Sequence, residues 1–238
     1  MRHIYDATIW NGNLQEKKAE NKKIMMRYLW TSMKIAAVIA MIAFIIHKEY
    51  QEYRFEHSTE MQMMTVPAGQ RASLVLADGT IVWLNSNSTL KYPATGFHAK
   101  ERKVILEGEG YFEVQSDRLH PFYVSVNEKM KVKAHGTKFN VKAYANDANI
   151  TTTLTSGKVE VSTQSRPPQT LKPNEQLTYD KSTSDIEIST VDTVDTNSWV
   201  KGKIIFTNAT AEEIFRTLER RYDTVIDHST DFSASRRY

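Results

Sequence analysis

The chain has 238 residues, no cysteine and a formal net charge of +3. The lack of cysteine excludes disulfides, thiolate chemistry, Cys-based zinc sites and a lipid-anchored lipoprotein. The small net charge, without a basic recognition helix, does not favour direct nucleic-acid binding. With 40% hydrophobic and 25% charged residues, the composition is that of a folded protein of one or two domains.

The first element along the chain is an apolar segment. Ile35 to Ile46 is an unbroken apolar run, and with the residues from Tyr28 onward it reaches the roughly 20 residues that a bilayer-spanning helix needs. A cleaved signal peptide and a buried core helix are the alternatives. However, no Ala-x-Ala-like site follows the run, and the run is apolar on all sides. We therefore expect a transmembrane helix over residues 28–46.

Basic residues determine the expected orientation of this helix. Most precede it or lie near its start, and the flanking set is Lys17, Lys18, Lys22, Lys23, Arg27 and Lys34, followed only by Lys48 and Arg54. Since the basic flank stays in the cytoplasm, residues 1–27 are expected to be a short basic cytoplasmic tail. The chain is then a single-pass protein of the inner (cytoplasmic) membrane, with its C-terminal domain in the periplasm. Polar residues 47–64 predict a juxtamembrane stalk or a helical extension.

Residues 65–191 predict an all-β domain. Short apolar or alternating runs recur at a spacing of roughly 8–12 residues, without a helical period. Turn residues such as Asp78-Gly79 and Ser156-Gly157 separate them and supply the positive φ that tight hairpins need. We expect strands at 73–76, 81–84, 103–106, 111–114, 122–126, 131–134, 138–143, 150–154, 158–162, 176–179 and 186–190. The fold class is mainly β, sandwich- or solenoid-like, and spacing alone does not distinguish these from a barrel.

Three conspicuous residues of this domain have structural interpretations. Trp83 lies in a fully apolar strand, Ile81 to Leu84, and is expected in the core. Gly108 and Gly110 lie between two expected strands, where no helix follows to make a phosphate site. They are typical of a bulge or a tight corner.

The sequence does not favour an enzyme. It has no nucleophile elbow and no motif for a Ser-His-Asp set. His135 is a conceivable metal ligand, but no second His, Asp or Glu stands at metal-ligand spacing from it. Glu107, Glu109 and Glu113 offer a carboxylate pair for glycoside chemistry, but their turn-and-strand setting has a simpler structural explanation. We therefore expect no catalytic residue, no metal site and no cofactor.

Beyond residue 191 the pattern changes. Residues 192–198 predict a linker, 199–207 a strand, and Thr210 to Glu213 a capping box that starts a helix. A second strand is expected at 224–226, so residues 199–238 predict a partial β-α-β module. An open strand edge accepts partner strands, which makes this module the candidate partner-binding surface. Its candidate residues are Lys203, Ile205 and Thr207 on the strand edge, with Glu212, Arg216 and Arg220 on the helix; packing inside the module is the alternative.

A set of ordered motifs carries a family resemblance. The motifs are Val66-Pro-Ala-Gly-Gln70, Leu76-Ala-Asp-Gly-Thr-Ile-Val-Trp-Leu-Asn85, Leu106-Glu-Gly-Glu-Gly-Tyr-Phe-Glu-Val114, His135-Gly-Thr-Lys-Phe-Asn-Val141 and Leu171-Lys-Pro-Asn-Glu-Gln176. Together they resemble the FecR family of bacterial anti-sigma regulators, particularly its Bacteroidetes branch. The segment 199–238 is similar to the first half of the small module that ends these proteins, a short N-terminal domain of the secretin/TonB type.

The resemblance implies a regulator that spans the inner membrane once. Its cytoplasmic part would bind an extracytoplasmic-function sigma factor, and its periplasmic part would sense the signalling domain of a TonB-dependent outer-membrane transducer. Against the family pattern, we expect this chain to be truncated at both ends, because its tail is too short for a helical bundle and its last module is incomplete. The alternative function is a membrane-anchored periplasmic glycan- or cell-wall-binding module, with Tyr92, Phe97 and Tyr144 as candidate stacking residues.

Overall fold

The computed structural model describes residues 2–56, 60–94, 97, 101–127, 129–164 and 166–227. Within residues 2–56, side chains are described at 22, 23 and 25–50. The chain divides into two compact units, Met1–Glu56 and His57–Tyr238, and each is described by itself. The end of the expected C-terminal module, residues 228–238, lies outside the described residues.

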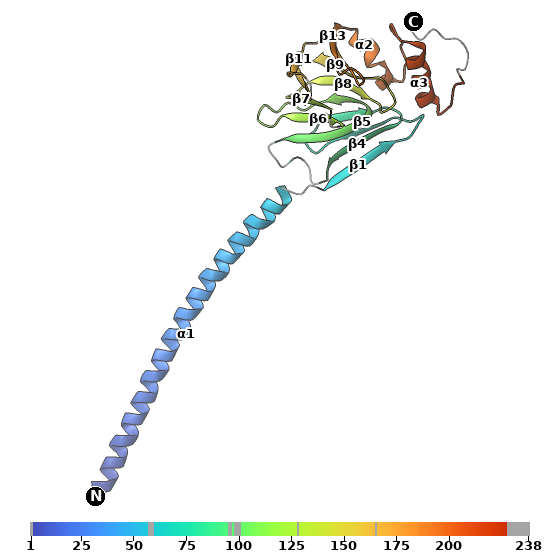
Figure 1. Cartoon of the computed structure of the whole chain (residues 1–238). Helices are drawn as coiled ribbons and strands as arrows, with labels where there is room; N and C mark the ends of the chain where they lie inside the picture. The colour runs from blue at the N-terminus through green and yellow to red at the C-terminus, as the bar shows by residue number, and fades with distance from the viewer. Residues whose placement is uncertain are drawn as a thin grey trace. The chain divides into compact units, whose positions relative to one another are not determined.

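The first unit is the single helix α1 (Arg2–Glu56), drawn in blue in Figure 1. Its segment Met25–Tyr50 has 26 residues and a mean hydropathy of 2.1, and none of its most apolar part is buried. At about 1.5 Å per residue this segment is roughly 39 Å long, which exceeds the ~30 Å hydrocarbon core of a bilayer. By length and composition it is a candidate membrane span, and the helix expected over residues 28–46 lies within it.

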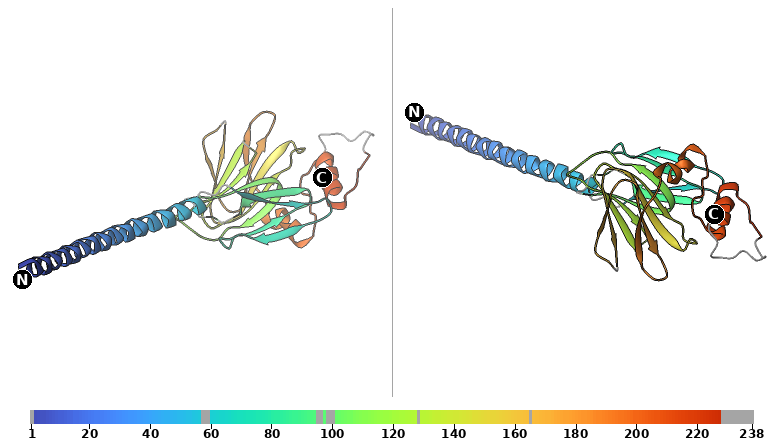
Figure 2. Two further views of the ribbon diagram at one scale, coloured as in Figure 1. Left: turned by 90° about the horizontal axis from the view of Figure 1, so that it is seen from below. Right: turned by 90° about the horizontal axis from the view of Figure 1, so that it is seen from above.

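The second unit is a curled sheet of 13 strands followed by short helices (Figures 1 and 2). The strands are β1 (Met61–Val66), β2 (Ala72–Val75), β3 (Ile81–Leu84), β4 (Ser88–Pro93), β5 (Arg102–Glu113), β6 (Phe122–Val126), β7 (Met130–Ala134), β8 (Lys138–Ala143), β9 (Asn149–Ser156), β10 (Val159–Thr163), β11 (Gln169–Leu171), β12 (Glu175–Asp180) and β13 (Ile186–Thr190). The mainly β fold class predicted from the sequence is confirmed.

The sheet has two arms that share β5. The first arm has the order β1-β4-β5-β6-β7-β10-β11, and the second has the order β2-β3-β5-β8-β9-β12-β13. Every pair is antiparallel except β5–β6, which is parallel. The chain changes arms at Gly108, which has φ +97° and no room for a Cβ, since that atom would lie 2.4 Å from Oγ of Ser88. A left-handed backbone without a side chain is what glycine provides, so the tight corner predicted here is confirmed.

The two arms enclose one hydrophobic core. Residues of β6 and of the first half of β5, Arg102 to Glu107, alternate between the core and the outer surface, as the side-chain period of two requires. From Gly108 to Phe112 the residues of β5 are buried on both faces. Phe112 from the second arm contacts Phe122 from the first, with ring centroids 6.2 Å apart, and stacks on Phe139 at 5.2 Å. All three rings are fully buried. The arrangement is therefore sandwich-like, one of the two architectures expected from the sequence.

Several strands differ from the predicted ones. The strands expected at 103–106 and 111–114 are the two halves of β5, and β1, β4 and β11 were not predicted at all. Strand β1 lies mostly within the range expected for the stalk. The expectation that Trp83 lies in the core is wrong, because β3 directs Val82 and Leu84 into the core and leaves Trp83 half-buried on the outer face.

The C-terminal segment contains helices and no described strand. The expected linker forms the short helix α2 (Thr193–Thr196), which Asp192 caps, and the 3₁₀ helix η1 (Ser198–Lys201) follows it. Helix α3 (Ala211–Tyr222) begins at the predicted capping box of Thr210 and Glu213. The strands expected at 199–207 and 224–226 are wrong: the first begins as η1, and no described residue pairs with either segment as a strand neighbour.

Candidate partner-binding site

A buried carboxylate connects three of the sequence motifs. Glu109 of β5 is 8% exposed. Its Oε2 accepts a hydrogen bond from the side-chain amide of Asn85 at 2.8 Å, and its Oε1 accepts one from Asn140 at 3.0 Å. Asn140 accepts in turn from the indole N–H of Trp199 at 3.2 Å. Each carboxylate oxygen has a hydrogen-bond donor, which offsets part of the cost of burying the group. The same network holds Trp199 against the second arm.

An arginine anchors α3 to the same arm. Arg220 is buried, its Nη1 lies 2.8 Å from Oδ1 of Asp147, and its guanidinium lies 3.9 Å from the ring centroid of Tyr144. The hydroxyl of Tyr144 donates to the carbonyl of Ser86 at 2.8 Å. Burial, with the negative charge of Glu109 nearby, raises the pKa of Tyr144 well above its usual value. The phenol therefore stays neutral and keeps its place between Arg220 and the sheet.

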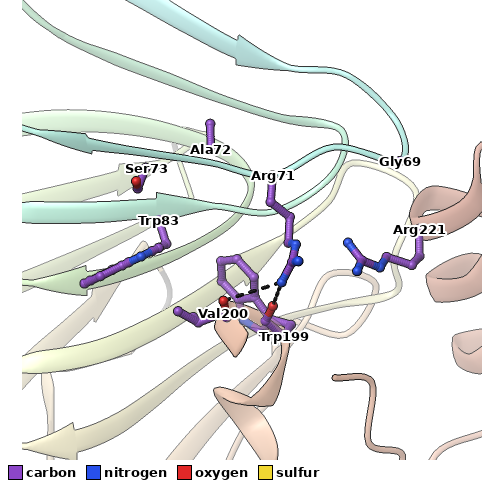
Figure 3. A pocket seen from close by; sticks show the side chains of 8 residues that line it. All are labelled: Gly69, Arg71, Ala72, Ser73, Trp83, Trp199, Val200 and Arg221. Atoms are coloured by element: carbon purple, nitrogen blue, oxygen red, sulfur yellow. Dashed lines mark hydrogen bonds between the residues drawn. The ribbon is translucent and has the colours of Figure 1, made fainter. Parts of the chain in front are cut away.

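The turn between β1 and β2 meets the end of α3. Gly69 has φ +73°, and its N–H donates to the carbonyl of Arg220 at 2.9 Å. This turn belongs to the Val66-Pro-Ala-Gly-Gln70 motif, and Arg71 directly follows it. The contact brings Arg71 close to Arg221, although the two residues are far apart in the sequence (Figure 3).

A pocket of about 410 Å³ lies where these segments meet (Figure 3). Its polar groups are the guanidinium groups of Arg71 and Arg221 and the side chain of Ser73, and its apolar walls include Trp83 and Trp199. Arg71 donates from Nη1 to the carbonyls of Trp199 and Val200, the latter at 3.4 Å. Partial burial and the positive charge of Arg221 lower the pKa of Arg71 from its ordinary value.

The charge of this pocket is uncompensated within the described part of the chain. There, no carboxylate forms an ion pair with Arg71 or Arg221. In the same residues no group of three His, Asp or Glu side chains lies close enough to hold a metal ion. The pocket therefore has the chemistry of an anion site with aromatic walls.

Comparisons with known proteins identify the family. The model of the FecR protein family matches residues 62–160. A crystal structure of a candidate anti-sigma factor from Parabacteroides distasonis ATCC 8503 has 32% identity and a TM-score of 0.69, over 73% of this chain and 81% of that one. The chain belongs to the FecR family. A second crystal structure of a candidate anti-sigma factor from the same organism has 31% identity and a TM-score of 0.70, over 74% of this chain and 83% of that one. Among curated proteins no match was found.

The predicted partner-binding residues of this FecR protein do not share one environment. Lys203, Ile205 and Thr207 are exposed, although they lie on a segment without regular secondary structure and not on a strand edge. Glu212 is exposed and pairs with Arg216 one turn along α3. Arg220 is buried against Asp147, where it attaches the helix to the domain. Whether any of them contacts a partner stays a prediction.

The other candidate residues of the FecR domain are mostly packed inside it. Glu113 pairs with Lys138 at 3.0 Å, and Glu109 belongs to the buried network described above. Of the aromatic residues considered for sugar stacking, Tyr144 is buried, Phe97 packs edge-on against Phe122 at 5.8 Å, and Tyr92 packs against the core.

Sequence reasoning missed the arginine pocket. Arg71 and Arg221 are separated in sequence by most of the domain. Neither residue belongs to a local motif that indicates binding. The one available signal was the position of Arg71, directly after a turn motif and before an alternating strand.

Proposed function

We infer that this FecR-family chain is a single-pass inner-membrane regulator that acts by protein–protein binding. It relays a signal from a TonB-dependent outer-membrane transducer, bound on the periplasmic side, to an extracytoplasmic-function sigma factor on the cytoplasmic side. Family membership supports a regulatory role and a sigma factor as partner in general. The transducer and the direction of the relay are the proposed parts.

The observation that carries this proposal is the order of the two units. A candidate membrane span at Met25–Tyr50 precedes a FecR match over residues 62–160. The basic flank of the span favours a cytoplasmic N-terminus. A regulator divided in this way by a membrane has one binding region on each side, which is the arrangement that a relay needs.

The first experiment is a two-way pull-down from native membranes. The tagged full chain is solubilised with its partners, and the eluate is examined for sigma factors and for TonB-dependent transducers. Recovery of both supports the relay, whereas recovery of neither contradicts it. An unrelated single-pass protein with the same tag is the control for adhesion to the resin.

The orientation has a separate test, which the lack of cysteine makes simple. Lys23→Cys and Lys172→Cys each introduce one exposed thiol, the first before the candidate span and the second in the β unit. In intact spheroplasts, a membrane-impermeant maleimide should label the Lys172→Cys chain alone. Labelling of the Lys23→Cys chain alone would reverse the proposed orientation.

A further inference from the structure

Strand β2 has a free edge beside the arginine pocket. In the described residues, β2 pairs with β3 and with no other strand. An edge strand carries backbone N–H and C=O groups that have no partner within the sheet. Ala72 and Ser73 of this strand line the pocket. A peptide that extended the sheet at β2 would therefore pass directly by the two guanidinium groups.

The side chains of β2 are divided between its two faces. Ala72 and Leu74 pack against the core, whereas Ser73 and Val75 are exposed, as is Arg71, which directly precedes the strand. Val75 is 68% exposed, so its apolar side chain is available to a partner on this face. The outer face of β2 thus has a cation at one end and an apolar side chain four residues along.

The two guanidinium groups of the pocket suit a carboxylate ligand. Arg71 donates to the carbonyls of Trp199 and Val200 from Nη1 alone. The other N–H groups of its guanidinium remain available as donors to a ligand. Arg221 faces it across the pocket (Figure 3). Two guanidinium groups repel each other unless an anion lies between them, and a carboxylate accepts from such groups with two oxygens at once. Trp83, which is directly opposite Ser73 in the register of the sheet, supplies an apolar wall.

We propose that the free edge of β2 binds an extended segment of a partner protein, with a carboxylate of that segment between Arg71 and Arg221. A strand added beside β2 directs alternate side chains to the outer face. The residue opposite Arg71 is acidic, and the residue opposite Val75, four positions along the peptide, is apolar. The inference rests on the proposed function in one respect, namely that the β unit binds a protein.

A peptide fits these features better than a free anion does. Strand addition gives main-chain hydrogen bonds that are independent of sequence, and the pocket then selects the side chain. A small anion would use the arginines and leave the β2 edge and Val75 without a partner.

The test uses the full chain in lipid nanodiscs, labelled with 5-fluorotryptophan. The chain has four tryptophans. Trp83 and Trp199 line the pocket, and Trp10 and Trp30 belong to the first unit and serve as internal controls. The probe is the acetylated, amidated peptide Thr-Thr-Glu-Thr-Ser-Thr-Val-Thr, together with its reversed sequence, and Kd is measured from the fluorine shifts.

Three matched probes separate the parts of the proposal. One has Gln in place of Glu. A second probe ends at the position of Glu and carries Gln there, with a free C-terminal carboxylate. It distinguishes binding of a terminal carboxylate from binding of a side-chain carboxylate. The third probe is a pair of peptides, each N-methylated at alternate residues along one edge of the extended peptide. In each of them strand pairing is blocked on the methylated edge alone. Arg71→Gln combined with Arg221→Gln removes the charge from the protein, and Arg118→Gln, an exposed arginine elsewhere, is the matched control.

The expected result is a shift of the Trp83 and Trp199 signals alone. We expect affinity about tenfold or more lower with the Gln peptide or the double variant, as for loss of a charge-assisted hydrogen bond, and loss of binding with one of the N-methylated peptides. Equal affinity for the Glu and Gln peptides, or unchanged affinity of the double variant, would overturn the proposal. A melting curve of the double variant that matches the wild type shows that the fold is retained, and the Gln peptide tests the charge without altering the protein.

The β2 site and the proposed function can be refuted independently of each other. Peptide binding requires neither a sigma factor nor a transducer, so a chain that captures no transducer still permits the peptide test. If wild type and double variant capture a transducer equally well, the proposed function stands and the β2 site is wrong.

Discussion

Replacing Arg220 by alanine should release α3 from the β unit while leaving the sheet folded. Ala211 and Arg220 are the two buried residues of this helix. The guanidinium of Arg220 pairs with Asp147 at 2.8 Å, and the two side chains are only 8% and 13% exposed. The attachment of helix α3 therefore depends strongly on Arg220, through the buried ion pair, the contact with the Tyr144 ring and the backbone bond from Gly69.

The magnitude follows from the burial of this pair. Removing one partner of a buried ion pair costs about 3–5 kcal/mol, because the other charge stays buried without compensation. Lys142, at 3.6 Å from the carboxylate of Asp147, offsets part of that cost. We therefore adopt about 3 kcal/mol for the lost docking energy, which corresponds to roughly a hundredfold larger population of the opened helix.

Hydrogen exchange measures this opening residue by residue. In Arg220→Ala, amides of α3 should exchange about a hundredfold faster, and amides of β5 should keep their wild-type rates. Arg216→Ala is the matched control: its guanidinium is 3.9 Å from Asp147 and 30% exposed, so its loss should cost at most about 1 kcal/mol. Equal acceleration of α3 in the two variants, or equal acceleration of α3 and β5 in Arg220→Ala, would refute the reasoning.

Three further predictions concern the sheet itself. Gly108→Ala should lower the free energy of unfolding by about 3 kcal/mol or more through overlap with β4, measured by urea denaturation. Gly79→Ala shares the positive φ, but its Cβ would meet only an ordinary van der Waals contact, with Gln115 at 3.9 Å, so a loss of about 1 kcal/mol is expected there. A similar loss in both variants would contradict the steric explanation. Glu109→Gln should lower the free energy of unfolding by about 1–3 kcal/mol, and so the melting temperature, because the amide has one acceptor oxygen where the carboxylate has two for the two asparagines. The control Glu107→Gln, at an exposed position, should change the melting temperature little. Hydrogen bonds from the turn that follows, first that of the Ser182 hydroxyl, lower the pKa of Asp180 from 3.8 to about 2. Its contribution to stability is present above pH 3.8 and lost as the pH falls towards 2, so the melting temperature of Asp180→Asn should decline less over that interval; parallel curves for variant and wild type would exclude this role.

The parts of the fold that the sequence predicted are those with a strong side-chain period. Strands β3, β6, β8 and β13 have the expected bounds, because alternation or a continuous apolar run marked them. Strand β1 was missed because only Val66 of this outer strand is buried, so its residues show little contrast between faces. Strand β11 is three residues long, too short for a period to be seen.

Pattern alone also misled in two places. In Ile81 to Leu84 all four residues are apolar, so the sequence did not indicate which face lies in the core, and Trp83 was assigned to the wrong one. The segment from Lys203 to Phe206 alternates between exposed and half-buried residues as a strand does, but strand formation also needs a neighbour, and no described strand lies beside it. A partner distant in sequence is not visible in local periodicity.

The candidate site was the least predictable part for the same reason. The capping box of α3 is local and was predicted correctly. The pocket joins Arg71, Trp83, Trp199 and Arg221, whose proximity depends on the turn at Gly69 and on the hydrogen bond from Trp199 to Asn140. Such contacts follow from the completed fold and have no signature within any one segment.

The sharing of β5 by both arms affects how the protein is made. As the chain is synthesised, the strands of the two arms appear in alternation: β10 and β11 complete the first arm, and β12 and β13 then complete the second. The first arm is complete only when Leu171 has been synthesised, and the second only when Thr190 has been synthesised. Pairings that span so much of the sequence form slowly. The β unit should therefore stay unfolded through most of its synthesis and fold in one late step, once its last strands have been released.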